Sequence, residues 1–302
     1  MEELKAEIKD APKADVHSHL HLAGSQKLFK QCYPNSNINF PSSYNGLNGM
    51  IDFIYGHLNS VMLTDKDVVT FMELGIESAI ADNVKLLEAS IDIGLSKFFN
   101  NSVDAIIDLT KSLKEQYKSR IDFRPDLGIN KQLDIDIVYS EGIEYLQSGI
   151  FHGIDLYGPE INKSFQPFVR FYDMARDFGL KTKVHAGEFA SHLSMEDAIL
   201  MLKPNEIQHG IRAIDSQSII DLILEHDIRL NTCPTSNILL GAEDSIENHP
   251  IRKLFDHGIK ITVNTDDLIL FNASVSDEFI KLLEASLFTF EELEIIRKNG
   301  FD

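Results

Sequence analysis

The chain has 302 residues, of which 43% are hydrophobic and 25% charged, enough to bury the core of one large globular domain or two ordinary ones. Its formal net charge of −19 argues against nucleic acid and anionic membranes as partners, because both require a basic face, and favours a small-molecule substrate. No run of about 18 apolar residues occurs, and the first residues are charged where a signal peptide would be apolar, so we expect a soluble, cytoplasmic protein.

The cysteine content limits how a metal could be bound. Only Cys32 and Cys233 are present, too few for a disulfide scaffold or a four-thiolate zinc site. Any metal must therefore be held by histidines and carboxylates.

The first segments predict a short helix over residues 1–11 and a strand over residues 13–21. The alternation of the strand places His17, His19 and His21 on one face. Three imidazoles on one side of a strand are costly to bury unless something binds them. Because neutral imidazole is the commonest transition-metal ligand, a metal site is favoured over a solvated, histidine-rich edge strand.

Further strands and helices alternate along the rest of the chain. Strands are expected at 84–93, 121–129, 150–157, 181–188, 206–209, 228–233 and 260–264. Helices are expected at 44–56, 65–82, 102–117, 134–147, 166–178, 194–201, 216–225 and 251–256. Eight strands that alternate with helices predict a closed parallel (β/α)8 barrel, the TIM barrel, formed by residues 1–302 as a single domain. Residues 34–49, rich in Asn, Ser and Gly, are expected to form a long loop over the carboxyl ends of the strands.

The fifth strand ends in a pair of chemically active side chains. His185, the flexible Gly187 and Glu188 follow one another within four residues, so an imidazole and a carboxylate reach one place. Such a pair alone is more often a surface or capping feature. Its weight comes from His209, at the end of the sixth strand, because barrel enzymes place their chemistry at the carboxyl ends of their strands.

The eighth strand ends in Asp266 and Asp267. Adjacent acids at a strand end are often helix caps. Closure of a barrel, however, makes strands eight and one neighbours and brings Asp266 beside His17 and His19. Three histidines and one carboxylate suit a single zinc ion with an open position for water, whose pKa zinc lowers toward neutrality.

Six short motifs occur in chain order. They are Pro12-Lys13-x-Asp15-Val16-His17-x-His19, Gly158-x-Glu160, His185-Ala186-Gly187-Glu188, His209-Gly210, Cys233-Pro234-Thr235-Ser236-Asn237 and Asn264-Thr265-Asp266-Asp267. In this combination the sequence resembles the adenosine/AMP deaminase family of the amidohydrolase superfamily, over nearly the whole chain.

The resemblance implies a site residue by residue. It implies one zinc ion per chain, held by His17, His19, His185 and Asp266. It also implies that Glu188 protonates the purine N1 and that His209 orients the attacking hydroxide, both as catalytic residues. For substrate binding it implies that Asp267 contacts N7 and the Gly158 backbone contacts N3, and His21 is a further candidate.

The implied reaction is hydrolytic deamination of an adenine nucleoside. Attack at C6 releases ammonia and leaves a 6-oxopurine, with adenosine, 2′-deoxyadenosine, a 5′-modified nucleoside or AMP as the substrate. Two alternatives stay open: a deaminase of another aminopurine or amino-heterocycle, and a zinc-binding scaffold without activity. A dinuclear site is disfavoured because the strand at 150–157 offers no lysine that could be carboxylated to bridge two metals.

The first motif departs from the family pattern His-x-His-Leu-Asp-Gly. Alignment on Pro12-Lys13 selects His17 and His19 as ligands, whereas alignment on Leu22-x-Gly24 selects His19 and His21; the first matches more residues. Ala23 then replaces the Asp that contacts the ribose 5′ end, which predicts weak discrimination at the 5′ position.

Two further departures concern other parts of the chain. Gln208 replaces the glycine that usually precedes the catalytic histidine. The chain ends soon after residues 291–299, so the resemblance implies a short variant without the family's final helices. The oligomeric state is left open.

Overall fold

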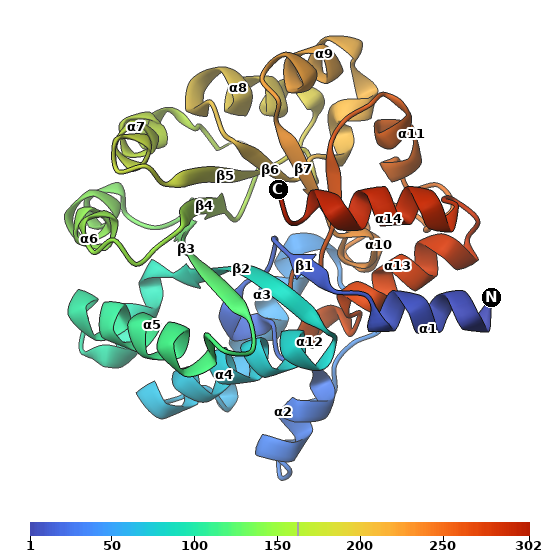
Figure 1. Ribbon diagram of the computed structural model, residues 1–302. Coiled ribbons are helices and arrows are strands. Elements are labelled where there is room, and N and C mark those ends of the chain that lie inside the picture. Colours follow the sequence, from blue (N-terminus) through green and yellow to red (C-terminus); the bar gives the residue numbers. More distant parts are fainter. Residues whose placement is uncertain (162) are drawn as a thin grey trace.

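The computed structural model describes residues 1–161 and 163–302. Eight parallel strands follow one another around a barrel in chain order, with helices on the outside (Figure 1). The strands are β1 Lys13–Asp15, β2 Val84–Asp92, β3 Asp122–Asn130, β4 Gly153–Tyr157, β5 Lys181–Ala186, β6 Glu206–His209, β7 Arg229–Thr232 and β8 Ile261–Val263. The predicted (β/α)8 barrel is confirmed.

The helices agree with the sequence pattern wherever it is strongly periodic. They are α1 Glu2–Asp10, α2 Gln26–Cys32, α3 Gly46–Gly56, α4 Asp65–Ala81, α5 Val103–Tyr117, α6 Ile135–Gln147, α7 Val169–Asp177, α8 His192–Leu202, α9 Gln217–Glu225, α10 Pro234–Leu239, α11 Ile251–Asp256, α12 Leu268–Phe271, α13 Val275–Glu284 and α14 Phe290–Asn299. Short 3-10 turns are η1 Leu20–Leu22, η2 Leu58–Ser60, η3 Ile93–Phe99, η4 Gln166–Phe168 and η5 Ile211–Asp215. Helices α2, α10, α12, α13 and α14 were not predicted.

Helix α4 shows why the periodic segments fold as expected. Thr64 and Asp67 form a capping box that satisfies the free N–H groups at its start. Val68 and Phe71, at helical spacing, are buried on the face that packs inward. None of the described helices combines the length and the apolar character needed to cross a bilayer.

The first strand is shorter than predicted, and this corrects the expectation that three histidines share its face. Regular pairing stops at Asp15, and His21 lies in η1 rather than on the strand. Beyond β1 the barrel closes through single contacts: Asp266 N–H donates to the carbonyl of His17 at 3.0 Å, and His19 N–H donates to the carbonyl of Asp266 at 3.3 Å. The backbone after β1 therefore leaves the sheet and turns into η1 at the place where strands β1 and β8 close the barrel.

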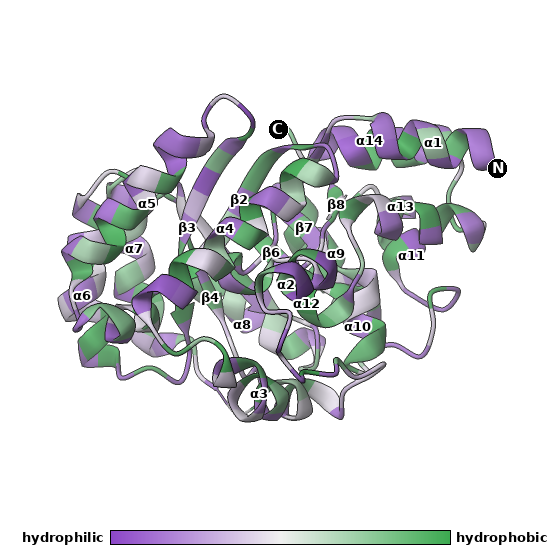
Figure 2. Cartoon of the chain, turned by 90° about the horizontal axis from the view of Figure 1, so that it is seen from below, coloured by the Kyte–Doolittle hydropathy of each residue, from purple (hydrophilic) through white to green (hydrophobic). Residues whose placement is uncertain are grey.

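The two ends of the barrel are covered differently. Helix α3 lies at the end opposite α1 and α14 (Figure 2). The predicted loop at 34–49 is irregular as far as residue 45, and its last residues belong to α3. Helix α14 contacts both β8 and β1, and Arg297 donates to the carbonyl of Pro12 at 2.6 Å. The outer layer therefore covers the place where β8 and β1 meet.

A charged cluster fills the barrel at the end away from α3. Lys183 is fully buried, with Nζ 2.6 Å from Glu88 and 2.7 Å from Asp126. Arg229 lies 2.8 Å from Glu206 in the same cluster. Burial opposes the charge on Lys183, but these carboxylates outweigh it and raise the pKa of the lysine.

Candidate active site

The site is built from strand ends where the chain turns sharply. Asp266 has φ of 56° and His209 has φ of 64°, a left-handed conformation that L-residues seldom adopt. Gly187 has φ of 72°, and a Cβ there would lie 2.2 Å from the sulfur of Met195, so only glycine fits. Such strain persists where the surrounding structure enforces it, often at functional sites.

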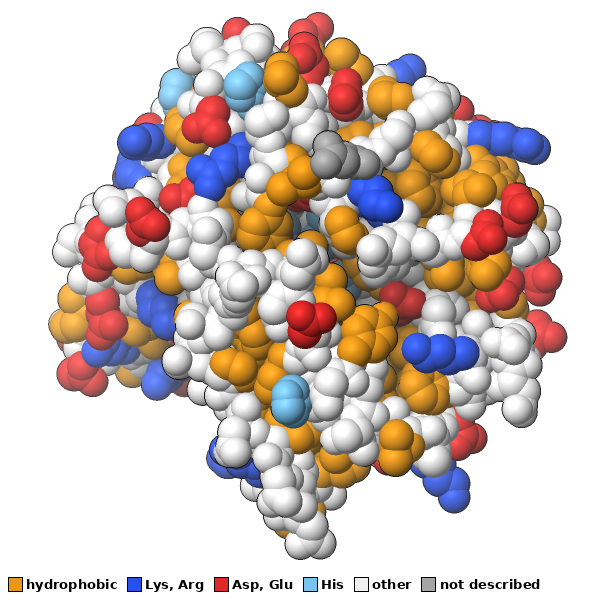
Figure 3. Space-filling model, turned by 180° about the vertical axis from the view of Figure 1, so that it is seen from behind, with side chains coloured by type: hydrophobic (Ala, Val, Ile, Leu, Met, Phe, Trp, Pro, Cys, Tyr) orange, Lys and Arg blue, Asp and Glu red, His pale blue; other side chains and the backbone are white. Residues whose placement is uncertain are grey.

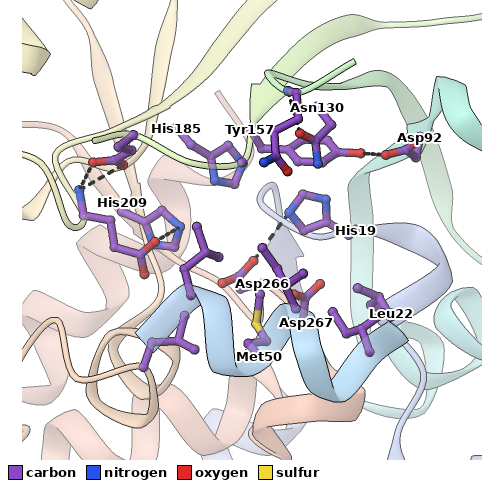
Figure 4. A pocket seen from close by; sticks show the side chains of 18 of the residues that line it. His19, Leu22, Met50, Asp92, Asn130, Tyr157, His185, His209, Asp266 and Asp267 are labelled. Carbon is purple, nitrogen blue, oxygen red and sulfur yellow. Dashed lines mark hydrogen bonds and ion pairs between the residues drawn. The ribbon is translucent and has the colours of Figure 1, made fainter. Parts of the chain in front are cut away.

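Three histidines and one carboxylate from three strand ends meet in the barrel. His17, His19 and His185 each offer a ring nitrogen within 4.8 Å of the others. Oδ1 of Asp266 lies 3.6 Å from Nε2 of His17 and 3.6 Å from Nε2 of His19. Figure 4 draws the ion pair between Asp266 and His19. The structure thus places two of the predicted ligands, His185 and Asp266, each beside the other two, His17 and His19. No group of potential metal ligands among the described residues includes His21, which favours the alignment that selects His17 and His19.

The chemistry of this cluster fits a metal ion. Nδ1 of His17 lies 2.9 Å from the carbonyl of Asn231, to which it donates, so Nε2 carries the free lone pair. Within the described chain that buried Nε2 has no hydrogen-bond partner. Burial lowers the pKa of His17, His19 and His185, in the case of His19 to about 3, and keeps the rings neutral, as ligands must be.

Cys233 also lies beside the cluster, with Sγ 3.3 Å from Nδ1 of His17. Burial raises the pKa of this thiol well above its ordinary value, so it stays protonated. Cys233 also forms a group of potential ligands with His17, His209 and Asp266, but its thiol would have to lose its proton to the metal.

Glu188 and His209 face each other next to the cluster. Oε2 of Glu188 lies 3.5 Å from Nε2 of His209, and Oε1 accepts a 2.8 Å hydrogen bond from Asn237. Burial, reinforced by the charges of Asp266 and Glu160, raises the pKa of Glu188 well above its ordinary value. Glu188 therefore holds its proton more readily than an ordinary carboxyl group and is suited to deliver one.

Glu160 shapes the loop that carries Glu188. Its carboxylate accepts hydrogen bonds from the backbone N–H groups of Glu188, Phe189 and Ala190, the last at 2.8 Å. On the other side, Nζ of Lys131 donates to the carbonyl of His185 at 2.9 Å. The two side chains hold both ends of the turn after β5.

A cavity of about 150 Å³ opens beside these residues under α3 (Figure 4). Figure 3 shows the molecule from behind, and on this face hydrophobic side chains border the hollow. Gly158 and Asp267 line the cavity, and Oδ1 of Asp267 is buried with no partner among the described residues. His21 also lines the cavity, and its buried Nδ1 likewise has no hydrogen-bond partner among the described residues. The predicted substrate-binding residues are thus gathered in one cavity.

A second hollow of about 440 Å³ adjoins the first. The two share His21, Asp92 and Asn130 in their walls. The outer hollow is lined further by residues of η3, among them Lys97. A ligand longer than a purine base can therefore extend outward past Asp92.

Ala23 does not line either hollow, which corrects the expectation that it faces the sugar. It is buried against α4, where a Cβ on Gly75 would lie 3.1 Å from its own. The reason is η1, which turns the chain after His19 and leaves His21 rather than Ala23 facing the cavity. Gln208 points into the barrel and accepts a 2.8 Å hydrogen bond from Asn231, so it ties β6 to β7.

Several residues of the site were not assigned from sequence. Asp155 lies on β4 with Oδ2 3.4 Å from Nε2 of His185, and a carboxylate in a buried strand is a signal that could have revealed it. Tyr157 donates to Asp92 and packs edge-on against His19 with ring centroids 4.5 Å apart. Asn237 belongs to the motif at residues 233–237, but its contacts with Glu188 and His209 arise only when the chain folds.

The barrel and its histidine-carboxylate cluster define a class. A TIM barrel with a cluster of potential metal ligands at the carboxyl ends of strands one, five and eight is typical of the amidohydrolases, and two solved structures share this fold. An adenine deaminase from Arthrobacter aurescens superposes with a TM-score of 0.81 at 22% identity, over 96% of this chain and 92% of that one. A zinc-bound amidohydrolase from Burkholderia ambifaria gives a TM-score of 0.80 at 22% identity, over 99% of this chain and 86% of that one.

Sequence comparison then gives the family. The family model described as adenosine deaminase matches residues 120–302. A protein of Treponema pallidum, provisionally named adenosine/adenine deaminase, is 34% identical over 93% of this chain and 94% of its own length. The chain belongs to the adenosine deaminase family of the amidohydrolase superfamily, and it is a metal-dependent hydrolytic deaminase of adenine compounds.

Proposed function

We propose that residues 1–302 form one catalytic domain that removes the 6-amino group of an adenine nucleoside by zinc-dependent hydrolysis. The observation that carries this proposal is the convergence, in one cavity, of a histidine cluster, of Glu188 with its raised pKa, and of the buried Oδ1 of Asp267, which has no partner among the described residues. These are the groups that hydrolysis of an aminopurine requires: a metal site, a proton donor and an anchor for the ring.

One zinc ion per chain is the proposed cofactor, with His17, His19, His185 and Asp266 as its ligands. When bound, zinc supplies a Lewis acid that lowers the pKa of water toward neutrality. Three imidazoles and one carboxylate match the donor set that zinc accepts in catalytic sites. The zinc-bound Burkholderia ambifaria structure, which shares the fold, supports the choice of metal.

The remaining residues orient the purine and move its proton. Glu188 donates the proton on its carboxyl to the purine N1, so that electrons of the ring can shift from the carbon under attack. Burial and the neighbouring Asp266 raise the pKa of Asp267, so its carboxyl group can keep a proton and donate it to N7, and the N–H of Gly158 can donate to N3. His209 steadies the attacking oxygen. The proton added at N1 offsets the charge that the attack places on the ring.

A nucleoside is proposed rather than the free base because of the outer hollow. A base alone would leave the space beyond Asp92 and Asn130 unfilled. A sugar can extend into it and meet Nδ1 of His21, which has no partner in the part of the chain that the structure describes. The acids Asp92 and Glu141 line this hollow together with a single lysine, Lys97, among the described residues. A 5′-phosphate therefore meets no net positive charge, and adenosine is expected to be preferred over AMP.

The test is a metal assay combined with an ammonia-release assay. The panel is adenine, adenosine, 2′-deoxyadenosine, 5′-deoxyadenosine and AMP, with other aminopurines and pterins as controls. Highest kcat/KM for a nucleoside supports the proposal. Highest kcat/KM for adenine would instead identify a base deaminase, and a zinc-loaded protein that releases no ammonia from any of these compounds would identify a scaffold.

A further inference from the structure

Asn237 lies fully buried between the two residues proposed to carry out catalysis. Its Nδ2 donates to Oε1 of Glu188 at 2.8 Å and lies 3.1 Å from Nδ1 of His209. Its Oδ1 lies 3.2 Å from Nε2 of His249, which is also buried. The proposed function assigns no role to Asn237 or His249, although any part that they play in catalysis rests on that function.

A backbone group sets the direction of these hydrogen bonds. The N–H of Ile251 can only donate, and it lies 3.2 Å from Nδ1 of His249. A neutral imidazole that accepts at Nδ1 carries its proton on Nε2. Burial lowers the pKa of His249 to about 3, so the ring is neutral. Nε2 of His249 therefore donates to Oδ1 of Asn237.

This donation fixes the orientation of the amide. A flipped amide would oppose its NH2 group to the N–H of His249, two donors facing each other. The NH2 group therefore faces Glu188 and His209 and donates one hydrogen to each. Because His209 accepts at Nδ1, its proton lies on Nε2, the nitrogen that is 3.5 Å from Oε2 of Glu188.

We propose that Asn237, held by His249, is a positioning residue that keeps His209 in the Nε2–H tautomer and leaves Oε2 of Glu188 as the oxygen that carries the transferred proton. In this tautomer His209 presents an N–H to the cavity. It stabilises the attacking oxygen by donating a hydrogen bond, not by removing a proton from it. The opposite tautomer would place the Nδ1–H of His209 against the NH2 group of Asn237.

The tautomers can be read directly from nitrogen NMR of the full zinc-loaded chain labelled with ¹⁵N-histidine. We expect His209 and His249 each to show an unprotonated Nδ1 and a protonated Nε2, with the signals assigned from His209→Gln and His249→Gln. A protonated Nδ1 on His209 in the unaltered protein would overturn the proposal. This measurement requires no turnover, so it is decisive even where the proposed substrate proves wrong.

Variants then test whether the arrangement matters for the reaction. Asn237→Asp keeps the shape but replaces the donor with an acceptor, and Asn237→Ala removes the donor without adding charge. Each should change the His209 tautomer signals and lower kcat about 100-fold or more, with KM changed only a few-fold, because a wrong tautomer can cost up to about 10⁴ in rate.

His249→Gln supplies another N–H donor to Oδ1 of Asn237, so it should retain kcat within about tenfold, equivalent to about 1.4 kcal/mol. The exposed His257→Gln, in the turn after α11, is the matched control and should change neither signals nor kcat. Unchanged His209 signals and unaltered kcat in Asn237→Ala would sink the assignment of Asn237.

Discussion

The hydroxyl of Ser236 donates a 2.6 Å hydrogen bond to Oδ2 of Asp266. This contact leaves Oδ1 of Asp266 facing His17 and His19, at 3.6 Å from each. A metal-binding carboxylate needs such a partner to fix which oxygen meets the metal. Ser236 therefore presents Asp266 to the proposed zinc site.

Ser236→Ala is expected to weaken zinc binding about 10- to 100-fold, the usual effect of losing the hydrogen-bond partner of a ligand. Competition with a chelator of known affinity measures it. Ser78→Ala is the control, because Ser78 is also buried and hydrogen-bonded, to the N–H of Ser25 at 2.7 Å, but lies on α4 away from the cluster. Equal zinc affinity in the two variants would mean that Ser236 does not orient Asp266.

The purified protein should hold about one zinc ion per chain, as a site with four protein ligands implies. His185→Ala and His17→Ala should lose it, because each removes a ring nitrogen from the cluster. His21→Ala should keep it and raise KM, since His21 lines the cavity but lies in η1. The zinc content of each variant, measured after dialysis, tests these expectations. Zinc retained in His17→Ala but lost from His21→Ala would restore the alternative alignment of the first motif.

Glu188→Gln should retain zinc and substrate affinity but lose turnover by about 10² to 10⁴, the range expected for the loss of a general acid. Glutamine has the same shape, and its oxygen can still accept the hydrogen bond from Asn237. Single-turnover kinetics and substrate binding would be measured side by side, with the exposed Glu225→Gln of α9 as the control. Normal turnover in Glu188→Gln would remove this residue from the mechanism.

Lys183→Met should lower the free energy of unfolding by about 3–5 kcal/mol, because it leaves buried carboxylates without their cation. The partners are Glu88 at 2.6 Å and Asp126 at 2.7 Å. Urea denaturation measures the loss, and Lys111→Met, at a half-exposed surface pair, should cost less than about 1 kcal/mol. Equal losses in the two variants would show that the charged cluster adds nothing to stability.

Acidification should also reduce the stability that the charged cluster around Lys183 contributes. Burial alone would raise the pKa of Glu88, but Lys183 and its neighbours hold it well below the ordinary value. A depressed pKa contributes stability above the pKa of the unfolded chain, and that contribution is lost as the pH falls through the folded pKa. The unfolding free energy of the unaltered protein should therefore fall more steeply on acidification than that of Lys183→Met.

The barrel, and the strand ends where the candidate site residues lie, could be predicted from local patterns in the sequence. Alternation and helical periodicity are local properties, so they identify each strand, and the residue that follows a strand necessarily lies at its carboxyl end. His185, Glu188, His209 and Asp266 could be predicted for that reason. The short helices α10 and α12 could not, because a turn or two of helix leaves too few residues to show a period.

The tertiary structure decided which side chains from different strands meet. The position of His17 and His19, rather than His21, beside Asp266, and the burial of Ala23 against α4, follow from the turn that the backbone makes where Asp266 closes the barrel. Asn237 meets Glu188 across 49 positions in sequence. Such contacts depend on strand register and barrel closure, which are set by backbone pairing between distant segments and leave no local pattern in the sequence.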